Sequence, residues 1–205
     1  CSSDLFDVSR EEFKATHHNL KIGDGAKRRA RLDAITPESK RAVSTKYTTE
    51  TMPKVFTWLN HNPRVVGHIR NQAQCGSCWA FSTVDTIETS WALAGNQFIG
   101  LSEENIVECD HTDDGCGGGD PGTAFAWLAQ SQNGWLSSEK SYPYTSGDGY
   151  TGSCKHSLID KAAHVSGHAD VSHNEEKMAA YLAEHGQLSI CVAASSWMNS
   201  KWCLD

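Results

Sequence analysis

The stretch CGSCW at residues 75–79 constrains this chain more than any other feature of its sequence. Two cysteines, Cys75 and Cys78, are separated there by a glycine and a serine. Apolar residues then recur every three or four positions, at Phe81, Val84, Ile87 and Trp91. This period predicts a helix that begins at Cys78 and ends near Gly95. One thiol is therefore expected in the first turn of a helix and the other in the loop before it.

Three kinds of site use such a cysteine pair. A zinc site could add Cys109 and Cys116, but six residues lie between these two, whereas structural zinc sites favour two to four. A thioredoxin-type redox pair accompanies a βαβ pattern, which we do not find here. The third kind is a nucleophilic thiol, and CGSCW matches at every position the signature around the papain-type nucleophile.

The chemistry favours Cys78 as the nucleophile. The first turn of a helix carries unpaired N–H groups and the positive end of the dipole, and both stabilise a thiolate. Beside a histidine, the pKa of such a thiol falls from ~8.5 to ~3–4. Cys75 lies outside the helix, where we expect it in a disulfide.

Composition limits the class of protein. The 205 residues suffice for one large domain or two small ones, and 39% hydrophobic with 21% charged residues is typical of globular proteins. No apolar run approaches the ~18 residues of a membrane helix. Without an initiator Met or a signal-like apolar stretch, the chain is expected to begin inside a longer precursor or to be a fragment.

Charge is unevenly divided along the chain. Residues 1–50 carry 10 Lys and Arg against 8 Asp and Glu, whereas residues 51–205 carry 8 against 17. This acidic body argues against nucleic acid as a partner. The basic run 27–31 remains open to two interpretations, a localisation or nucleic-acid patch and a solvated or processed leader segment. Eight cysteines suggest an oxidising compartment.

The remaining elements follow from local signals. We expect a short leader helix at 7–20, a polar linker up to about 50, and further helices at 101–110, 119–134 and 174–185. Their expected N-caps are Ser102, Asp120 and Asn174. The run LSICVAA at 188–194 is predicted to be a buried strand. Helices first and strands later indicate an α+β fold in two parts.

The sequence resembles the papain family of cysteine peptidases, of the cathepsin L-like, cruzipain type. The stretches NQAQCGSCWAFSTV, LSEENIVECD, GCGGGDPGTAFAWL, SEKSYPYTSGDG and ASSWM appear in the family's order, within residues 53–198. The resemblance implies a papain-like two-part fold, with a mostly helical left half at 52–163 and an incomplete β-rich right half at 164–205. Residues 1–51 resemble the end of an inhibitory propeptide, cut in the family at about 49–52.

The resemblance also implies residue roles. Cys78 attacks the peptide bond, and the side chain of Gln72 with the Cys78 backbone N–H stabilises the oxyanion. The implied disulfides are Cys75–Cys116 and Cys109–Cys154. The implied substrate-binding residues are Gly76, Gly118, Gly119, Asp120, Pro121 and Cys191. Because a carboxylate disfavours apolar ligands, Asp120 predicts a pocket that prefers basic or small side chains.

The family's histidine and asparagine are expected ~130–150 residues after the nucleophile, and 127 residues follow Cys78. None of the ten histidines lies in a family histidine motif. We therefore expect a cysteine endopeptidase fragment that is inactive alone, with a non-catalytic papain-like protein that binds peptides or partners as the alternative. The resemblance implies no metal or cofactor, peptide or protein substrates, the propeptide as inhibitor, a monomer, and a lysosomal or secreted location.

Overall fold

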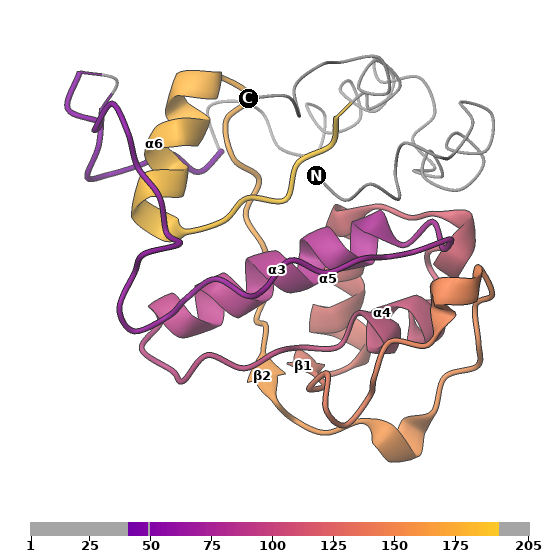
Figure 1. Cartoon of the computed structure of the whole chain (residues 1–205). Coiled ribbons are helices and arrows are strands. Elements are labelled where there is room, and N and C mark those ends of the chain that lie inside the picture. Colours follow the sequence, from indigo (N-terminus) through magenta and orange to yellow (C-terminus); the bar gives the residue numbers. More distant parts are fainter. Residues whose placement is uncertain (1–40, 49, 193–205) are drawn as a thin grey trace, which may run out of the picture.

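The computed structural model of the chain describes residues 41–48 and 50–192 (Figure 1). The leader helix expected at 7–20 and the end of the expected strand, 193–194, lie outside these residues. The described α-helices are α3 (Cys78–Leu93), α4 (Glu103–Cys109), α5 (Pro121–Ser131) and α6 (Glu175–His185). The strands are β1 (Trp135–Leu136) and β2 (Ala163–His164), and 3-10 turns occur at η3 (Gly115–Gly117), η4 (Ser146–Asp148) and η5 (His156–Leu158).

The helix positions agree with the sequence-based predictions because local capping determines where these helices begin. The Ser102 hydroxyl accepts the Asn105 N–H at 2.9 Å at the start of α4. Asp120 and Asn174 cap α5 and α6 in the same way. Gly95, at φ +91°, adopts the left-handed conformation just after α3.

The core lies where α3 packs against α4 and α5 (Figure 1). Its largest fully buried side chains include Trp79, Leu101 and Leu128. The antiparallel pair β1–β2 closes one side, with Leu136 opposite Ala163 and both fully buried. In the described part, α3, α4 and α5 precede the two short strands and α6 follows them, which agrees with the expected α+β class. None of the described helices has the length and apolar character needed to cross a membrane.

The predicted buried strand at 188–194 is wrong over the residues that the structure describes. Residues 188–192 form no strand, and Ile190 and Val192 are 55% and 49% exposed. A strand requires a neighbouring strand to satisfy its backbone. This segment instead lies along α3, where Gln187 accepts from the Thr89 hydroxyl at 2.6 Å and the hydroxyls of Ser189 and Ser82 are 2.7 Å apart.

Candidate active site

Cys78 is the first residue of α3 and its thiol is free. The preceding residue, Ser77, caps no backbone N–H with its side chain, and its hydroxyl pairs instead with the Tyr144 hydroxyl at 2.9 Å. The backbone N–H groups of Trp79 and Cys78 point to the Cys78 sulfur, and their hydrogen bonds lower the pKa of the thiol. Burial has the larger effect, and together with Cys191 it raises the net pKa of the Cys78 thiol.

Two disulfides shape the loops around this thiol. Cys75 is bonded to Cys116, and the Gly76 N–H donates to the Cys116 carbonyl at 3.0 Å, so the loop before α3 is joined to η3. The second disulfide, Cys109–Cys154, joins the end of α4 to the chain before η5. Both pairings are as expected. Because these four sulfurs are bridged, they are not available as zinc ligands, and no group of three or more metal-binding side chains occurs within residues 41–48 and 50–192.

Gln72 lies against the same loop. The Gln72 side-chain amide donates to the Cys75 carbonyl at 2.8 Å, and the Gln72 backbone carbonyl accepts from the Tyr144 hydroxyl at 2.9 Å. An amide nitrogen carries two N–H donors, so one remains for an incoming oxygen. Tyr144 therefore contacts both Gln72 and Ser77, a positioning role that the sequence analysis did not assign to it.

The glycine loop 117–119 faces the indole of Trp79. A side chain at Gly119 would place its Cβ 2.5 Å from the Trp79 ring, so only glycine fits there. Gly118 has φ +112°, a conformation that favours glycine. The Trp79 indole N–H donates to the Gly115 carbonyl at 3.1 Å and holds the ring in this place. Trp79 thus joins the first turn of α3 to the loop that leads to Asp120.

Asp120 has a structural role at the start of α5. One of its carboxylate oxygens accepts the Gly122 N–H at 2.7 Å and so caps α5, while its own N–H donates to Asp113 at 3.0 Å. Asp113 and Asp110 are two acidic residues here that were not predicted from the sequence, although the stretch DHTDD at 110–114 contains both. Burial raises the pKa of Asp113 to about 6, and repulsion from the neighbouring Asp110 and Asp120 carboxylates contributes to this increase. Burial also raises the pKa of Asp110.

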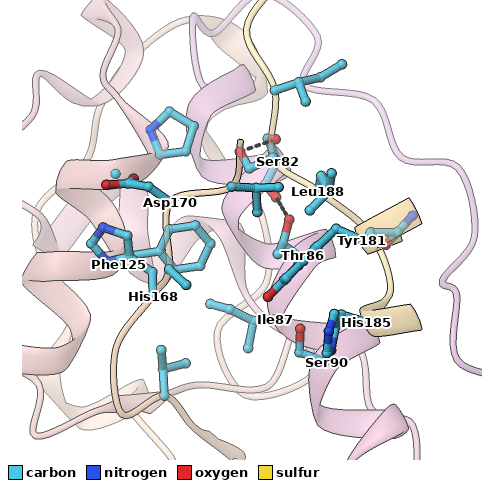
Figure 2. A pocket seen from close by; sticks show the side chains of 18 of the residues that line it. Ser82, Thr86, Ile87, Ser90, Phe125, His168, Asp170, Tyr181, His185 and Leu188 are labelled. Carbon is cyan, nitrogen blue, oxygen red and sulfur yellow. Dashed lines mark hydrogen bonds between the residues drawn. The ribbon is translucent and has the colours of Figure 1, made fainter. Parts of the chain in front are cut away.

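A large open cavity of about 1490 Å³ runs along α3 (Figure 2). Its wall includes four of the predicted site residues, Cys78, Asp120, Pro121 and Cys191. Figure 2 shows other parts of the wall, with Ile87 from α3, Phe125 from α5 and Tyr181 from α6. Because Ser189 is hydrogen-bonded one turn beyond Cys78, the chain that follows brings Cys191 towards the thiol, and Cys191 is exposed. Gln72, Gly76, Gly118 and Gly119 lie in the two loops beside this wall.

Several histidines line the cavity, and two of them contact aromatic rings. The His168 ring stacks on Phe125 at 5.6 Å between centroids, and the His185 ring lies 4.3 Å from that of Tyr181. Over the residues that the structure describes, no histidine is among the groups that shift the pKa of Cys78.

A free thiol at the start of the central helix, beside a bridged cysteine and a glycine loop, is the arrangement of a papain-like thiol site. The model of the papain family cysteine proteases matches residues 52–202 of the chain. The chain belongs to this family. The fold is similar to that of a procathepsin L2 from Tenebrio molitor larval midgut, with a TM-score of 0.66 and 28% identity over 88% of this chain and 54% of that one. This similarity supports the cathepsin L-like type.

Two further comparisons agree. The "Cysteine proteinase" of Trypanosoma brucei brucei is 39% identical over 94% of this chain and 40% of its own length, and cysteine proteinase B of Leishmania mexicana is 38% identical over 96% and 43%. The proform of the ragweed cysteine protease Amb a 11 has a TM-score of 0.68, at 28% identity over 87% of this chain and 51% of that one. The chain spans less than half the length of the curated Trypanosoma and Leishmania relatives.

Proposed function

We propose that this chain is part of a papain-like cysteine endopeptidase in which Cys78 is the nucleophile. The observation that carries the proposal is the separation of the two motif cysteines. Cys75 is held in a disulfide, whereas Cys78 is free at the first turn of α3 and lines the cavity. Residues 1–51 are then the end of an inhibitory propeptide, followed by a helical half at 52–163 and part of a second half at 164–205.

The chemical role of each residue follows from this placement. The Cys78 sulfur attacks the carbonyl carbon of a peptide bond, a C–S bond forms, and negative charge moves to the carbonyl oxygen. The free N–H of Gln72 and the backbone N–H of Cys78 are the donors for that oxyanion. The thiol proton passes to the family's histidine, expected in the longer chain, which returns it to the leaving amine when the C–N bond breaks. Water then hydrolyses the thioester and regenerates the thiol.

The substrate-binding residues are proposed on the same basis. Gly76, Gly118 and Gly119 line the approach of a peptide backbone, and Asp120, Pro121 and Cys191 form the pocket for the residue before the scissile one. Asp113 supports this pocket by holding the Asp120 N–H. The substrates are peptides or proteins, and the two disulfides support a lysosomal or secreted location.

We further propose that residues 1–205 alone are inactive. The thiol is a nucleophile only as a thiolate, and burial keeps the pKa of Cys78 raised in the described part, where no imidazole offsets it. The same raised pKa favours, as a second candidate, a non-catalytic protein that uses the cavity to bind peptides.

The test compares residues 1–205 with a longer chain that includes the family's histidine and asparagine. Both are assayed with a fluorogenic dipeptide near pH 5, with Cys78→Ala as the matched control. We expect turnover only from the longer chain, abolished by the substitution. Turnover by residues 1–205 that depends on Cys78 would refute their inactivity, and an inactive longer chain would favour the binding protein.

A further inference from the structure

Residues 41–48, just before the proposed cleavage region, are bound to the body of the molecule. The Ala42 N–H donates to the Asp170 carbonyl at 2.9 Å, and its carbonyl accepts the Ser172 N–H at 3.3 Å. These bonds form an isolated parallel bridge between Ala42 and Val171. The segment therefore lies alongside residues 170–172, as an added short strand would.

Two residues further along, the chain surrounds one carboxylate of α6. Glu184 accepts from the Ser44 hydroxyl at 2.5 Å, the Thr45 N–H at 2.8 Å, the Thr45 hydroxyl at 2.7 Å and the Lys46 N–H at 3.0 Å. Both carboxylate oxygens take part, and side-chain exposure of Glu184 is 15%. We call these contacts of Ser44, Thr45 and Lys46 with Glu184 the Glu184 clasp.

The chain returns to α6 soon after the clasp. Residues 50–57 are exposed apart from the half-buried Met52. At the end of this stretch, the indole N–H of Trp58 donates to the Leu182 carbonyl of α6 at 2.8 Å. Residues 50–52 of the proposed cleavage region thus belong to a largely exposed loop, and the contacts on either side of this loop attach to residues two positions apart on one helix. Exposed loops are preferred sites of proteolysis. A cut in this loop breaks the chain without breaking either attachment.

The clasp is also far from the proposed nucleophile. The residues directly after α6 lie against the C-terminal half of α3, where Gly186 is close to Leu93 and Gln187 accepts from the Thr89 hydroxyl. Eleven residues separate Cys78 from Thr89, which is about 16 Å along a helix. The Glu184 clasp therefore lies towards the opposite end of α3 from Cys78.

Acid does not remove the charge on which the clasp depends. The donors from Ser44, Lys46 and Thr45 lower the pKa of the Glu184 carboxyl to about 2. The other ionisable groups that lie at Glu184 are Tyr181 and His185, whose Nε2 is 3.5 Å from a Glu184 oxygen. The hydrogen-bonded carboxylate is therefore retained between pH 7 and about pH 4.5.

We propose that Glu184 and residues 170–172 form a binding site for the leader, distinct from the Cys78 site, which retains the leader after the chain has been cut at 49–52. The ligand of this site is an extended segment with two adjacent hydroxyl side chains, supplied here by Ser44 and Thr45. Removal of the leader is then a second step after cleavage, and a fall in pH alone does not produce it. This inference rests on the proposed function only in taking residues 1–51 as a leader.

The experiment separates cleavage from release. A recognition sequence for a site-specific protease is inserted between Thr51 and Met52 of the 205-residue chain, which carries Cys78→Ala so that no intrinsic activity is needed. After complete cutting, the rate at which the labelled leader leaves the body is measured by gel filtration at pH 7 and about pH 4.5. Hydrogen exchange of the Thr45 and Lys46 amides is followed in parallel.

We expect the leader to remain bound in the parent at both pH values, with both amides protected. Because hydrogen bonds to an ionised group are roughly twice as strong as neutral ones, Glu184→Ala should release the leader about tenfold faster and expose both amides. Glu175→Ala, at an exposed position in the first turn of α6, is the matched control and should behave like the parent. Should Glu184→Ala not fold, the leader-side double variant Ser44→Ala with Thr45→Val makes the same test.

The proposal is overturned if the parent leader leaves as fast as that of Glu184→Ala, or if it leaves about tenfold faster at pH 4.5 than at pH 7. Because the measurement uses Cys78→Ala, it does not depend on whether the protein is a peptidase. Failure of the proposed peptidase function and failure of the proposed leader-binding site therefore give different experimental results.

Discussion

At the scale of single residues, Cys78 shows how burial competes with a helix N-terminus. Its position in the first turn of α3 provides two backbone N–H groups, which lower the thiol pKa. A helix N-terminus stabilises an anion by only ~0.3–1 kcal/mol, up to ~2 when partly buried. Burial outweighs this contribution and raises the pKa. A larger thiolate fraction at neutral pH therefore requires a further stabilising charge beside the sulfur.

We predict that Cys78 of the 205-residue chain is alkylated slowly at pH 7. Its pH–rate profile with iodoacetamide should have a midpoint above the ~8.5 of a free thiol, because the folded pKa is raised. The exposed Cys191 provides the internal comparison, with labelling resolved by peptide mass spectrometry and each of Cys78→Ser and Cys191→Ser as controls. A Cys78 midpoint well below 8.5 would show that one of the histidines present pairs with the thiol.

At the scale of secondary structure, Asp120 serves both α5 and the cavity. Its carboxylate caps α5 through the Gly122 N–H, and Pro121 occupies the first helical position. Asp120 therefore cannot be changed for specificity alone without weakening the helix. A substitution that keeps the cap but removes the charge separates the two roles.

We predict that Asp120→Ala lowers the free energy of unfolding by about 1 kcal/mol, within the ~0.5–2 kcal/mol range for lost caps. Asp120→Asn should stay close to the parent, since asparagine is an equally good cap. Urea unfolding followed by tryptophan fluorescence measures both. Equal losses in the two variants would mean that the carboxylate charge, and not the cap, accounts for the stability.

At the scale of the whole molecule, one buried cation connects the chain before α3 to α3 and α4. The Arg70 guanidinium lies 2.9 Å from Glu88 and 2.6 Å from Glu103, with both carboxylate side chains at most 2% exposed. It also contacts Asp85 at 2.5 Å. A single guanidinium does not compensate for so much buried negative charge. Burial raises the pKa of Glu88 to about 7 and that of Glu103 to about 8.

This arrangement predicts that the fold is more stable in acid. Between the unfolded value of ~4.3 and the raised folded values, the native state binds more protons than the unfolded state, so stability decreases as pH rises through that window. We expect the unfolding temperature to decrease by several degrees from pH 5 to pH 8, at about 2–4 °C per ~1 kcal/mol for a chain of this size.

Glu103→Gln should flatten this dependence, because it removes the group with the higher raised pKa. Glu175→Gln, at the exposed start of α6, should leave it unchanged. Calorimetry across pH 5–8 gives the slope for each protein. A parent whose stability increases over this range would contradict the assignment of neutral buried carboxyls.

Features encoded by neighbouring residues could be predicted from the sequence. The four helices of the described part, their caps at Ser102, Asp120 and Asn174, and the position of Cys78 at the start of α3 depend on residues a few positions apart. The disulfides followed from the family resemblance, since spacing alone leaves the pairing of cysteines open.

What the tertiary structure decided depends on residues far apart in the sequence. The apolar run at 188–192 predicted a strand, but strand formation depends on a partner, and here the segment lies along α3. The raised pKa values of Cys78, Glu88 and Glu103 come from burial, which is a property of the packed molecule. The Glu184 clasp joins residues that are 138 to 140 positions apart, and no local pattern indicates that contact.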